Sequence, residues 1–178
     1  MLELLAPAGN LDAVIAAVQN GADAVYMGFG DGFNARRSAD NFTRESFAKA
    51  VRYCHIRGCK VYVTLNTLVG DREMDAAAAL AQQASDAGAD AILVQDLGLA
   101  RVLRAALPDI PLHASTQMAI HNRQGAAFAR EAGFDRVVLA REMSYAEIAE
   151  CAREGIELEA FVTARCACPA RGSACSPA

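Results

Sequence analysis

The sequence predicts an α/β fold, an incomplete (β/α)8 TIM-like barrel of about seven strands and six helices. Three observations support this fold class. Short apolar runs alternate with helical segments of ten to fifteen residues, as in parallel sheets whose strands are covered on both faces. A glycine two residues before an aspartate and an apolar strand recurs at positions 21, 88 and 133. The alternative fold, an open doubly wound sheet, usually has a glycine-rich phosphate loop after its first strand, and the sequence APAGN does not match that loop.

The composition indicates one compact domain. Of the 178 residues, 53% are hydrophobic and 21% are charged, which suffices for a single sizeable core. The net charge of −4 and the pI of about 5.4 give no general attraction to nucleic acid, although basic residues could gather on one face. The first ten residues contain an acid and a glycine and no basic stretch, so we expect no signal peptide, no membrane partner and a cytoplasmic protein.

Apolar periodicity and capping residues predict the elements in order. Residues 2–6 form the first strand and residues 7–9 a turn, and Asn10 then caps a helix that Gly21 ends. The strand at 24–28 leads into the longest loop, a candidate substrate loop. The other strands are expected at residues 60–66, 90–96, 112–116, 136–142 and 157–162, and the other helices at 43–57, 73–87, 97–107, 117–132 and 144–154.

Polar side chains gather where the predicted strands end, which is where barrels keep their reactive groups. The richest stretch is LHASTQMAIHN at 112–122, because alternate residues of its strand share one side. The candidate catalytic residues are His113, Ser115, Gln117, Arg141 and Glu142, and the candidate substrate-binding residues are Asn34, Arg36, Asn66, Gln95 and Asp96. Most are amides and hydroxyls, which suit a polar planar substrate or a peptide backbone, with an arginine for a carboxylate or a phosphate.

Several of these residues have a structural interpretation as well. His113 is as consistent with a satisfied core histidine as with a catalyst. A Ser115–His113 dyad would be strained, because residues two apart on a strand are roughly 7 Å apart at the backbone. Glu142 could form an acid pair with Asp96 or, more simply, a salt bridge with Arg141. No GxSxG or HExxH motif occurs, and we predict no metal ligands in this chain.

Eight short stretches occur in a recognisable order: ELLAPAGN at 3–10, GADAVYMG at 21–28, FNAR at 33–36, NFT at 41–43, VYVTLNTLV at 61–69, VQDLG at 94–98, LHASTQM at 112–118 and VVLARE at 137–142. Together they resemble the N-terminal barrel of the peptidase U32 family, the collagenase-like proteases. The resemblance implies a bacterial protease acting on peptide bonds. As an alternative, it implies a factor for hydroxylation of tRNA or ribosomal RNA bases, or of ubiquinone precursors. A non-catalytic binding fragment is a third alternative.

The resemblance also carries expectations about cofactors and partners. In family members of the hydroxylation kind, cysteines beyond the first barrel segment hold an iron–sulfur cluster. We therefore expect no cofactor in this chain and such a cluster in the intact protein. The expected partners are a peptide or RNA substrate and the remaining C-terminal part of the same protein. An intact member is expected to be an enzyme, and this shorter chain is expected to be inactive.

Residues 1–162 are predicted to be a partial U32-type barrel domain, and residues 163–178 an aberrant tail. The tail, TARCACPARGSACSPA, has the composition that GC-rich DNA yields out of frame. The tail can be back-translated into codons, and one cytosine can be placed before them to shift the reading frame. The new frame then reads HGALCVPGQGQCLLS. This nearly matches the sequence that the family resemblance implies after Val162, which is approximately HGALCVSYSGQCLLS. We therefore predict a single-base deletion after the Val162 codon, which makes Cys166, Cys168 and Cys175 accidental.

Overall fold

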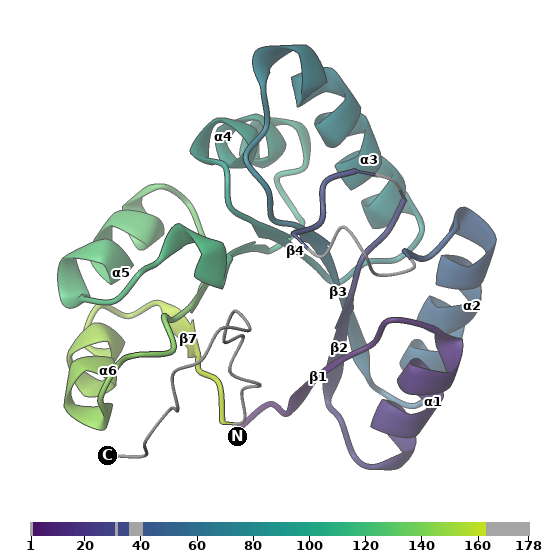
Figure 1. Cartoon of the computed structure of the whole chain (residues 1–178), viewed down its shortest axis with the longest axis horizontal. Coiled ribbons are helices and arrows are strands. Elements are labelled where there is room, and N and C mark those ends of the chain that lie inside the picture. The colour runs from purple at the N-terminus through teal and green to yellow at the C-terminus, as the bar shows by residue number, and fades with distance from the viewer. Residues whose placement is uncertain (1, 31, 36–40, 163–178) are drawn as a thin grey trace, which may run out of the picture.

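The computed structural model describes residues 2–30, 32–35 and 41–162. Within these ranges, seven parallel strands lie side by side in the order of the chain and curve into an incomplete barrel. Six α-helices cover the outer face of the curved sheet (Figure 1). The strands at the two edges, β1 (Leu5–Pro7) and β7 (Glu157–Glu159), lie on either side of the open part of the barrel. The predicted fold class is therefore confirmed.

The strands are short and the helices span two to four turns. The strands are β1 Leu5–Pro7, β2 Ala24–Met27, β3 Lys60–Leu65, β4 Ala91–Val94, β5 Leu112–Ala114, β6 Arg136–Val138 and β7 Glu157–Glu159. The helices are α1 Leu11–Gln19, α2 Arg44–His55, α3 Met74–Asp86, α4 Leu97–Ala106, α5 Arg123–Glu131 and α6 Tyr145–Ala152, with short 3-10 turns η1 Asp71–Glu73 and η2 Thr116–Met118.

Side-chain caps explain where most helices begin. A side-chain oxygen at the N-cap accepts a hydrogen bond from a backbone N–H of the first turn, which otherwise has no partner in the helix. The predicted cap of α1 is confirmed, because Asn10 accepts from Ala13. In α2 Thr43 accepts from Ser46, and in α6 Ser144 forms a capping box with Glu147. In α4 and α5 the caps are Asp96 and Asn122.

The repeated junction has a structural role that the sequence pattern did not reveal. Each helix-ending glycine adopts the left-handed conformation, with φ of +87° at Gly21, +97° at Gly88 and +89° at Gly133. The aspartate two residues later accepts a hydrogen bond from a backbone N–H at the start of the preceding strand. The pairs are Asp23 with Leu4 at 2.8 Å, Asp90 with Val61 at 2.7 Å and Asp135 with Leu112 at 2.8 Å. Each junction thus ends a helix and fixes the register of a strand pair.

The larger core lies between the sheet and the helices. In β3, Val61, Val63 and Leu65 belong to this core, whereas Tyr62 and Thr64 lie on the other face of the strand. Tyr62 packs inside the barrel with a smaller cluster of Ala24, Ala91, Leu93 and Val138. The inner face therefore carries polar side chains as well as apolar ones, and these include the functional candidates.

Some predicted boundaries are wrong. β1 runs over Leu5–Pro7 rather than 2–6. It is an edge strand, and a proline, which has no backbone N–H to donate, is tolerated in such a strand. The strands predicted at 90–96, 136–142 and 157–162 end earlier, at Val94, Val138 and Glu159. The predicted helix start at Gln117 is only the 3-10 turn η2, because Ala119 turns into the left-handed region at φ +53° and Asn122 then caps α5.

Within the described ranges, none of the helices has the length and apolar character needed to cross a membrane. Cys54 and Cys151 are free thiols buried in the core. The predicted aberrant tail and the candidate Arg36 lie outside the residues that the structure describes.

Candidate functional site

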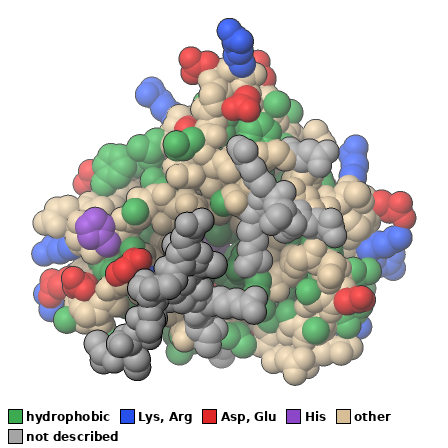
Figure 2. Space-filling model, in the orientation of Figure 1, with side chains coloured by type: hydrophobic (Ala, Val, Ile, Leu, Met, Phe, Trp, Pro, Cys, Tyr) green, Lys and Arg blue, Asp and Glu red, His purple; other side chains and the backbone are tan. Residues whose placement is uncertain are grey.

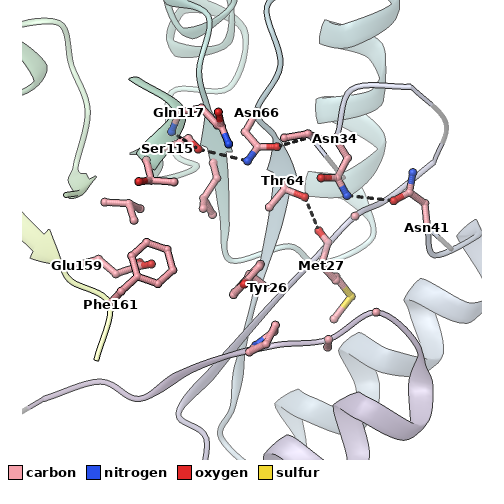
Figure 3. A pocket seen from close by; sticks show the side chains of 18 of the residues that line it. Tyr26, Met27, Asn34, Asn41, Thr64, Asn66, Ser115, Gln117, Glu159 and Phe161 are labelled. Carbon is pink, nitrogen blue, oxygen red and sulfur yellow. Dashed lines mark hydrogen bonds between the residues drawn. The ribbon is translucent and has the colours of Figure 1, made fainter. Parts of the chain in front are cut away.

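A pocket lies at the carboxyl ends of the strands, on the inner side of the curved sheet (Figure 3). Its cavity volume is about 150 Å³. Strands from both halves of the barrel contribute to it, together with the loops that follow them. The lining residues are Pro7, Ala8, Gly9, Tyr26, Met27, Gly28, Asn34, Ala35, Asn41, Thr64, Asn66, Leu93, Ser115, Thr116, Gln117, Val138, Arg141, Glu159 and Phe161.

A chain of hydrogen bonds joins three candidate residues in the pocket. The side chain of Asn66 accepts a hydrogen bond from the backbone N–H of Ala35 at 3.1 Å and donates one to the Ser115 hydroxyl at 3.3 Å. Ser115 also accepts from the backbone N–H of Gln117 at 3.3 Å. Asn66 therefore connects the long loop after β2 to the turn after β5, and its amide is held in one orientation (Figure 3).

Gly28 allows two asparagines to approach the backbone closely. Asn34 donates a hydrogen bond to Asn41 at 3.2 Å, and both amides lie where a side chain at position 28 would have to be. Asn41 was not among the sequence candidates. The only signal for it was its place in the long loop, within one of the stretches that resemble the family.

His113 and Ser115 lie two positions apart in the chain but do not form a hydrogen-bonded pair in the described part of the structure. The His113 ring packs edge-on against Tyr62, with ring centroids 4.9 Å apart, and its Nδ1 is buried without a hydrogen bond to a described residue. Burial, with the positive charge of Arg136 adding to it, lowers the pKa of His113 to about 4. The imidazole is therefore neutral near pH 7.

Two other candidates support the shape of the site. Asp96 accepts hydrogen bonds from Leu99 at 2.8 Å, as the cap of α4, and from the backbone of Val69 at 3.4 Å. The Gln95 amide donates to the backbone carbonyl of Gln117 at 3.3 Å. Neither residue lines the pocket. Both instead hold in place the backbone segments that surround it, Asp96 at Val69 and Leu99 and Gln95 at Gln117.

At the rim, Arg141 and Gln117 line the pocket with exposed side chains. The Arg141 guanidinium lies over the Phe161 ring, 4.6 Å from its centroid. Glu142 is exposed and does not line the pocket. Among the described side chains, Glu142 forms no ion pair with Arg141 and no acid pair with Asp96.

Glu159 is a pocket residue that the sequence analysis missed. It ends β7, and its Oε2 is buried without a hydrogen bond to a described residue. The Nη1 atom of Arg136 lies 3.7 Å from Oε2. Burial raises the pKa of Glu159 to about 7, with Arg136 opposing this rise and Glu3 adding to it. A signal was present, since residues 157, 159 and 161 alternate along the last strand and so share one side of it.

Below the pocket, Glu3 anchors a network of charges across the barrel interior. Its carboxylate accepts hydrogen bonds from Arg136 at 2.6 Å, from Tyr62 at 2.7 Å and from Lys60 at 2.9 Å. Burial alone would raise the pKa of Glu3, but these three donors outweigh burial and hold the pKa at about 2. The network joins the N-terminal segment to β6, near the opposite edge of the sheet.

The described residues do not fit an iron–sulfur cluster. No group of three or more His, Cys, Asp or Glu side chains among them is placed to hold a metal ion. Cys54, Cys59 and Cys151 are buried and do not line the pocket. Burial raises the pKa of each thiol, that of Cys54 to about 12, whereas such clusters are held by thiolates.

Comparison with known proteins gives consistent relationships. The family model described as peptidase family U32 matches residues 9–175. The chain is 41% identical over 161 residues to "tRNA hydroxylation protein P1" of Bacillus subtilis, covering 90% of this chain and 38% of that protein. It is 42% identical over 147 residues to "23S rRNA 5-hydroxycytidine C2501 synthase" of Escherichia coli, covering 83% of this chain and 22% of that protein. It is 35% identical over 147 residues to "Collagenase" of Porphyromonas gingivalis, covering 82% of this chain and 34% of that protein.

These curated relatives are much longer than the chain, which spans 22% to 38% of their lengths. Among solved structures, the U32 peptidase Mk0906 matches with a TM-score of 0.73 and 17% sequence identity, over 90% of this chain and 68% of that one. At this level of identity the likeness concerns the fold alone, and it agrees with the incomplete barrel described above.

Proposed function

The chain belongs to the peptidase U32 family, and we propose that it is the base-binding part of an RNA hydroxylation protein. On this proposal the pocket takes one pyrimidine base of a tRNA or a ribosomal RNA. The observation that carries the proposal is a small cavity whose polar lining consists mainly of amides and hydroxyls, with an arginine and an aromatic ring at its rim.

The size and lining of the cavity suit one planar polar group. Its volume of about 150 Å³ is smaller than the roughly 300–1,000 Å³ of sites for drug-sized ligands, so one ring fits better than several residues of a peptide. The side chains of Asn66 and Gln117 each present a donor and an acceptor. Enzymes that act on a base take it out of its stack and bind its Watson–Crick edge with such groups.

The rim offers a surface for stacking. Phe161 is 38% exposed, and the Arg141 guanidinium lies over its ring. Aromatic rings and guanidinium planes are the groups on which proteins stack unpaired RNA bases. A base that enters the pocket, or the base next to it, could therefore stack at Phe161 and Arg141.

The charges of the chain bear on how RNA would be held. Figure 2 shows Lys and Arg side chains mainly around the edge of the visible face, interspersed with acidic ones. With a net charge of −4, long-range attraction to phosphates is weak. Phosphate contacts would therefore come from these edge residues and from the rest of the longer protein, which we propose as the partner of this segment. We further propose that the intact protein acts in the cytoplasm and that its cysteine ligands for an iron–sulfur cluster lie outside the described residues.

Peptide-bond hydrolysis, the first expectation from the sequence, remains the second candidate, because a relative at 35% identity is named "Collagenase". The geometry supports it less. The Ser115 hydroxyl accepts hydrogen bonds from Asn66 and from the backbone of Gln117, and the neutral, buried His113 does not contact it through a hydrogen bond. Activation of a serine needs a base within hydrogen-bonding distance.

The test is a genetic one in the host of the intact gene. We expect deletion to remove a hydroxylated pyrimidine from tRNA or ribosomal RNA, measured by mass spectrometry of digested nucleosides. The intact gene should restore the modification, and so should a gene with the change Gln82→Ala on the exposed side of α3. The change Gln117→Ala in the pocket should not restore it. Unchanged RNA modification together with loss of a peptide-cleaving activity would instead favour the peptidase.

A further inference from the structure

We infer that the Glu159 carboxylate is the pocket group that binds the N–H edge of the base, and that it does so in its charged form. This inference rests on the proposed function, because it specifies which part of the base the pocket recognises. It assigns a binding role to a residue that was not a candidate from the sequence.

The position of Glu159 places it within reach of a ligand. The residue ends β7 at the edge of the sheet and lines the pocket. Figure 3 shows its side chain directed into the cavity beside Phe161, on the side opposite Asn34 and Asn41. A ring that stacks at Phe161 would therefore have the Glu159 carboxyl close to its edge.

Glu159 has acceptor capacity that its described neighbours do not use. Its Oε2 is buried without a hydrogen bond, and Arg136 at 3.7 Å is too far to donate one. Arg136 is already committed to Glu3 at 2.6 Å and to Glu157 at 2.9 Å. A buried acceptor without a donor is destabilising, so a ligand N–H that reaches Oε2 gains both a hydrogen bond and relief of that penalty.

The protonation of Glu159 can change in the range in which cells operate. Its pKa is raised to about 7 by burial. The charged or titratable groups that share its surroundings are Arg136 of β6, Glu3 before β1, Lys60 and Tyr62 of β3, His113 of β5 and Arg141 at the rim. His113 is already neutral at this pH, since its pKa is lowered to about 4 by burial, and burial raises the pKa of Tyr62. Glu159 is therefore the member of this set whose charge changes near neutral pH.

The ligand chemistry follows from the charge. A carboxylate accepts hydrogen bonds and does not donate them, so it selects N–H groups such as N3–H of uracil or the 4-amino group of cytosine. Only the deprotonated fraction of Glu159 binds in this way. Because the apparent affinity scales with the competent fraction, it should rise about tenfold between pH 6 and pH 8 for a pKa of about 7.

The experiment measures nucleoside binding to the 178-residue chain by NMR titration at pH 6 and pH 8. The probes are uridine, cytidine and 3-methyluridine, which lacks the N3–H. We expect uridine and cytidine to bind about tenfold more tightly at the higher pH, and 3-methyluridine to bind more weakly than uridine at pH 8. Glu159→Gln should abolish the pH dependence, whereas Glu131→Gln on the exposed end of α5 should retain it.

A stability measurement separates a binding role from a structural one. Glu159→Gln removes a buried charge, so its urea midpoint should exceed that of the wild type at pH 8. The two midpoints should become equal at about pH 4, below the usual glutamate pKa of 4.5, where the carboxyl is protonated in the folded and the unfolded state. A loss of stability at both pH values would overturn the inference, and so would unchanged pH dependence of nucleoside binding in Glu159→Gln. In the latter case the base pocket itself would stand. Absence of binding by all three nucleosides would instead contradict the proposed function and the inference that rests on it.

Discussion

Glu3 joins the first residues of the chain to β6 through the interior of the barrel, and its replacement is a direct test of the fold. Its carboxylate accepts hydrogen bonds from Arg136, Lys60 and Tyr62 at 2.6–2.9 Å. The change Glu3→Gln keeps the size of the side chain but removes the charge. Among the described acidic side chains, Arg136 then keeps Glu157 at 2.9 Å and the more distant Glu159 as neighbours.

The pKa of Glu3 gives the magnitude. The pKa falls from 4.5 to about 2. At about 1.36 kcal/mol for each unit of pKa, the charged Glu3 side chain therefore contributes at most about 3.4 kcal/mol to the free energy of unfolding. The side chain of Glu3 is 22% exposed and that of Lys60 is 54% exposed, so water screens part of the interaction. After this discount we expect Glu3→Gln to lower the free energy of unfolding by about 1–2 kcal/mol at pH 7.

The direction of the pH dependence follows from the sign of the shift. The folded-state pKa lies below the unfolded-state value, so the stabilisation is fully present above about pH 4.5 and is lost as the pH falls toward 2. Urea unfolding at pH 7 and pH 3, at one fixed protein concentration, should show a smaller difference between wild type and Glu3→Gln at pH 3. Glu131→Gln serves as the control with the same charge change. An equal difference at both pH values, or none at pH 7, would refute the assignment.

Three further predictions concern the junctions, the pocket and the tail. Asp23→Ala should lower the free energy of unfolding by about 1–2 kcal/mol in urea unfolding, because it leaves the Leu4 N–H without its charged acceptor, whereas Asp109→Ala on the exposed turn before β5 should have little effect. In an intact relative, Gln117→Ala and Arg141→Ala should each lower RNA modification at least tenfold while shifting the urea midpoint little, since both side chains are exposed at the pocket rim; equal losses of activity and stability would show that they are structural. Resequencing the locus should reveal the single-base deletion after the Val162 codon. If the frame is instead unbroken and a mass spectrum contains the TARCAC peptide, the deletion is either an ancestral event or did not occur.

The fold was predictable because its signals are local. The glycine and aspartate of each junction, and caps such as Asn10 and Thr43, act within a few residues or on the neighbouring strand. Gln117 was misassigned as a helix start, because a short 3-10 turn and a helix begin with the same kind of cap. The resulting error was confined to a few residues.

The pocket was predictable in location but not in chemistry. Strand ends identified Asn66, Ser115 and Gln117, because parallel strands bring their carboxyl ends together. The properties of Glu159 depend on burial and on Arg136, and those of Arg136 depend on Glu3, which lies 133 positions away in the chain. Such long-range charge coupling leaves no local pattern in the sequence.

The most direct test of the base pocket is to observe its side-chain amides during binding. In a ¹⁵N-labelled chain, we expect a short single-stranded RNA rich in uridine and cytidine to shift the side-chain NH₂ signals of Asn66 and Gln117. The Gln82 signal on α3 should stay in place, and a collagen-like peptide at the same concentration should shift none of the three. Shifts of Asn66 and Gln117 with the peptide but not with the RNA would contradict the account.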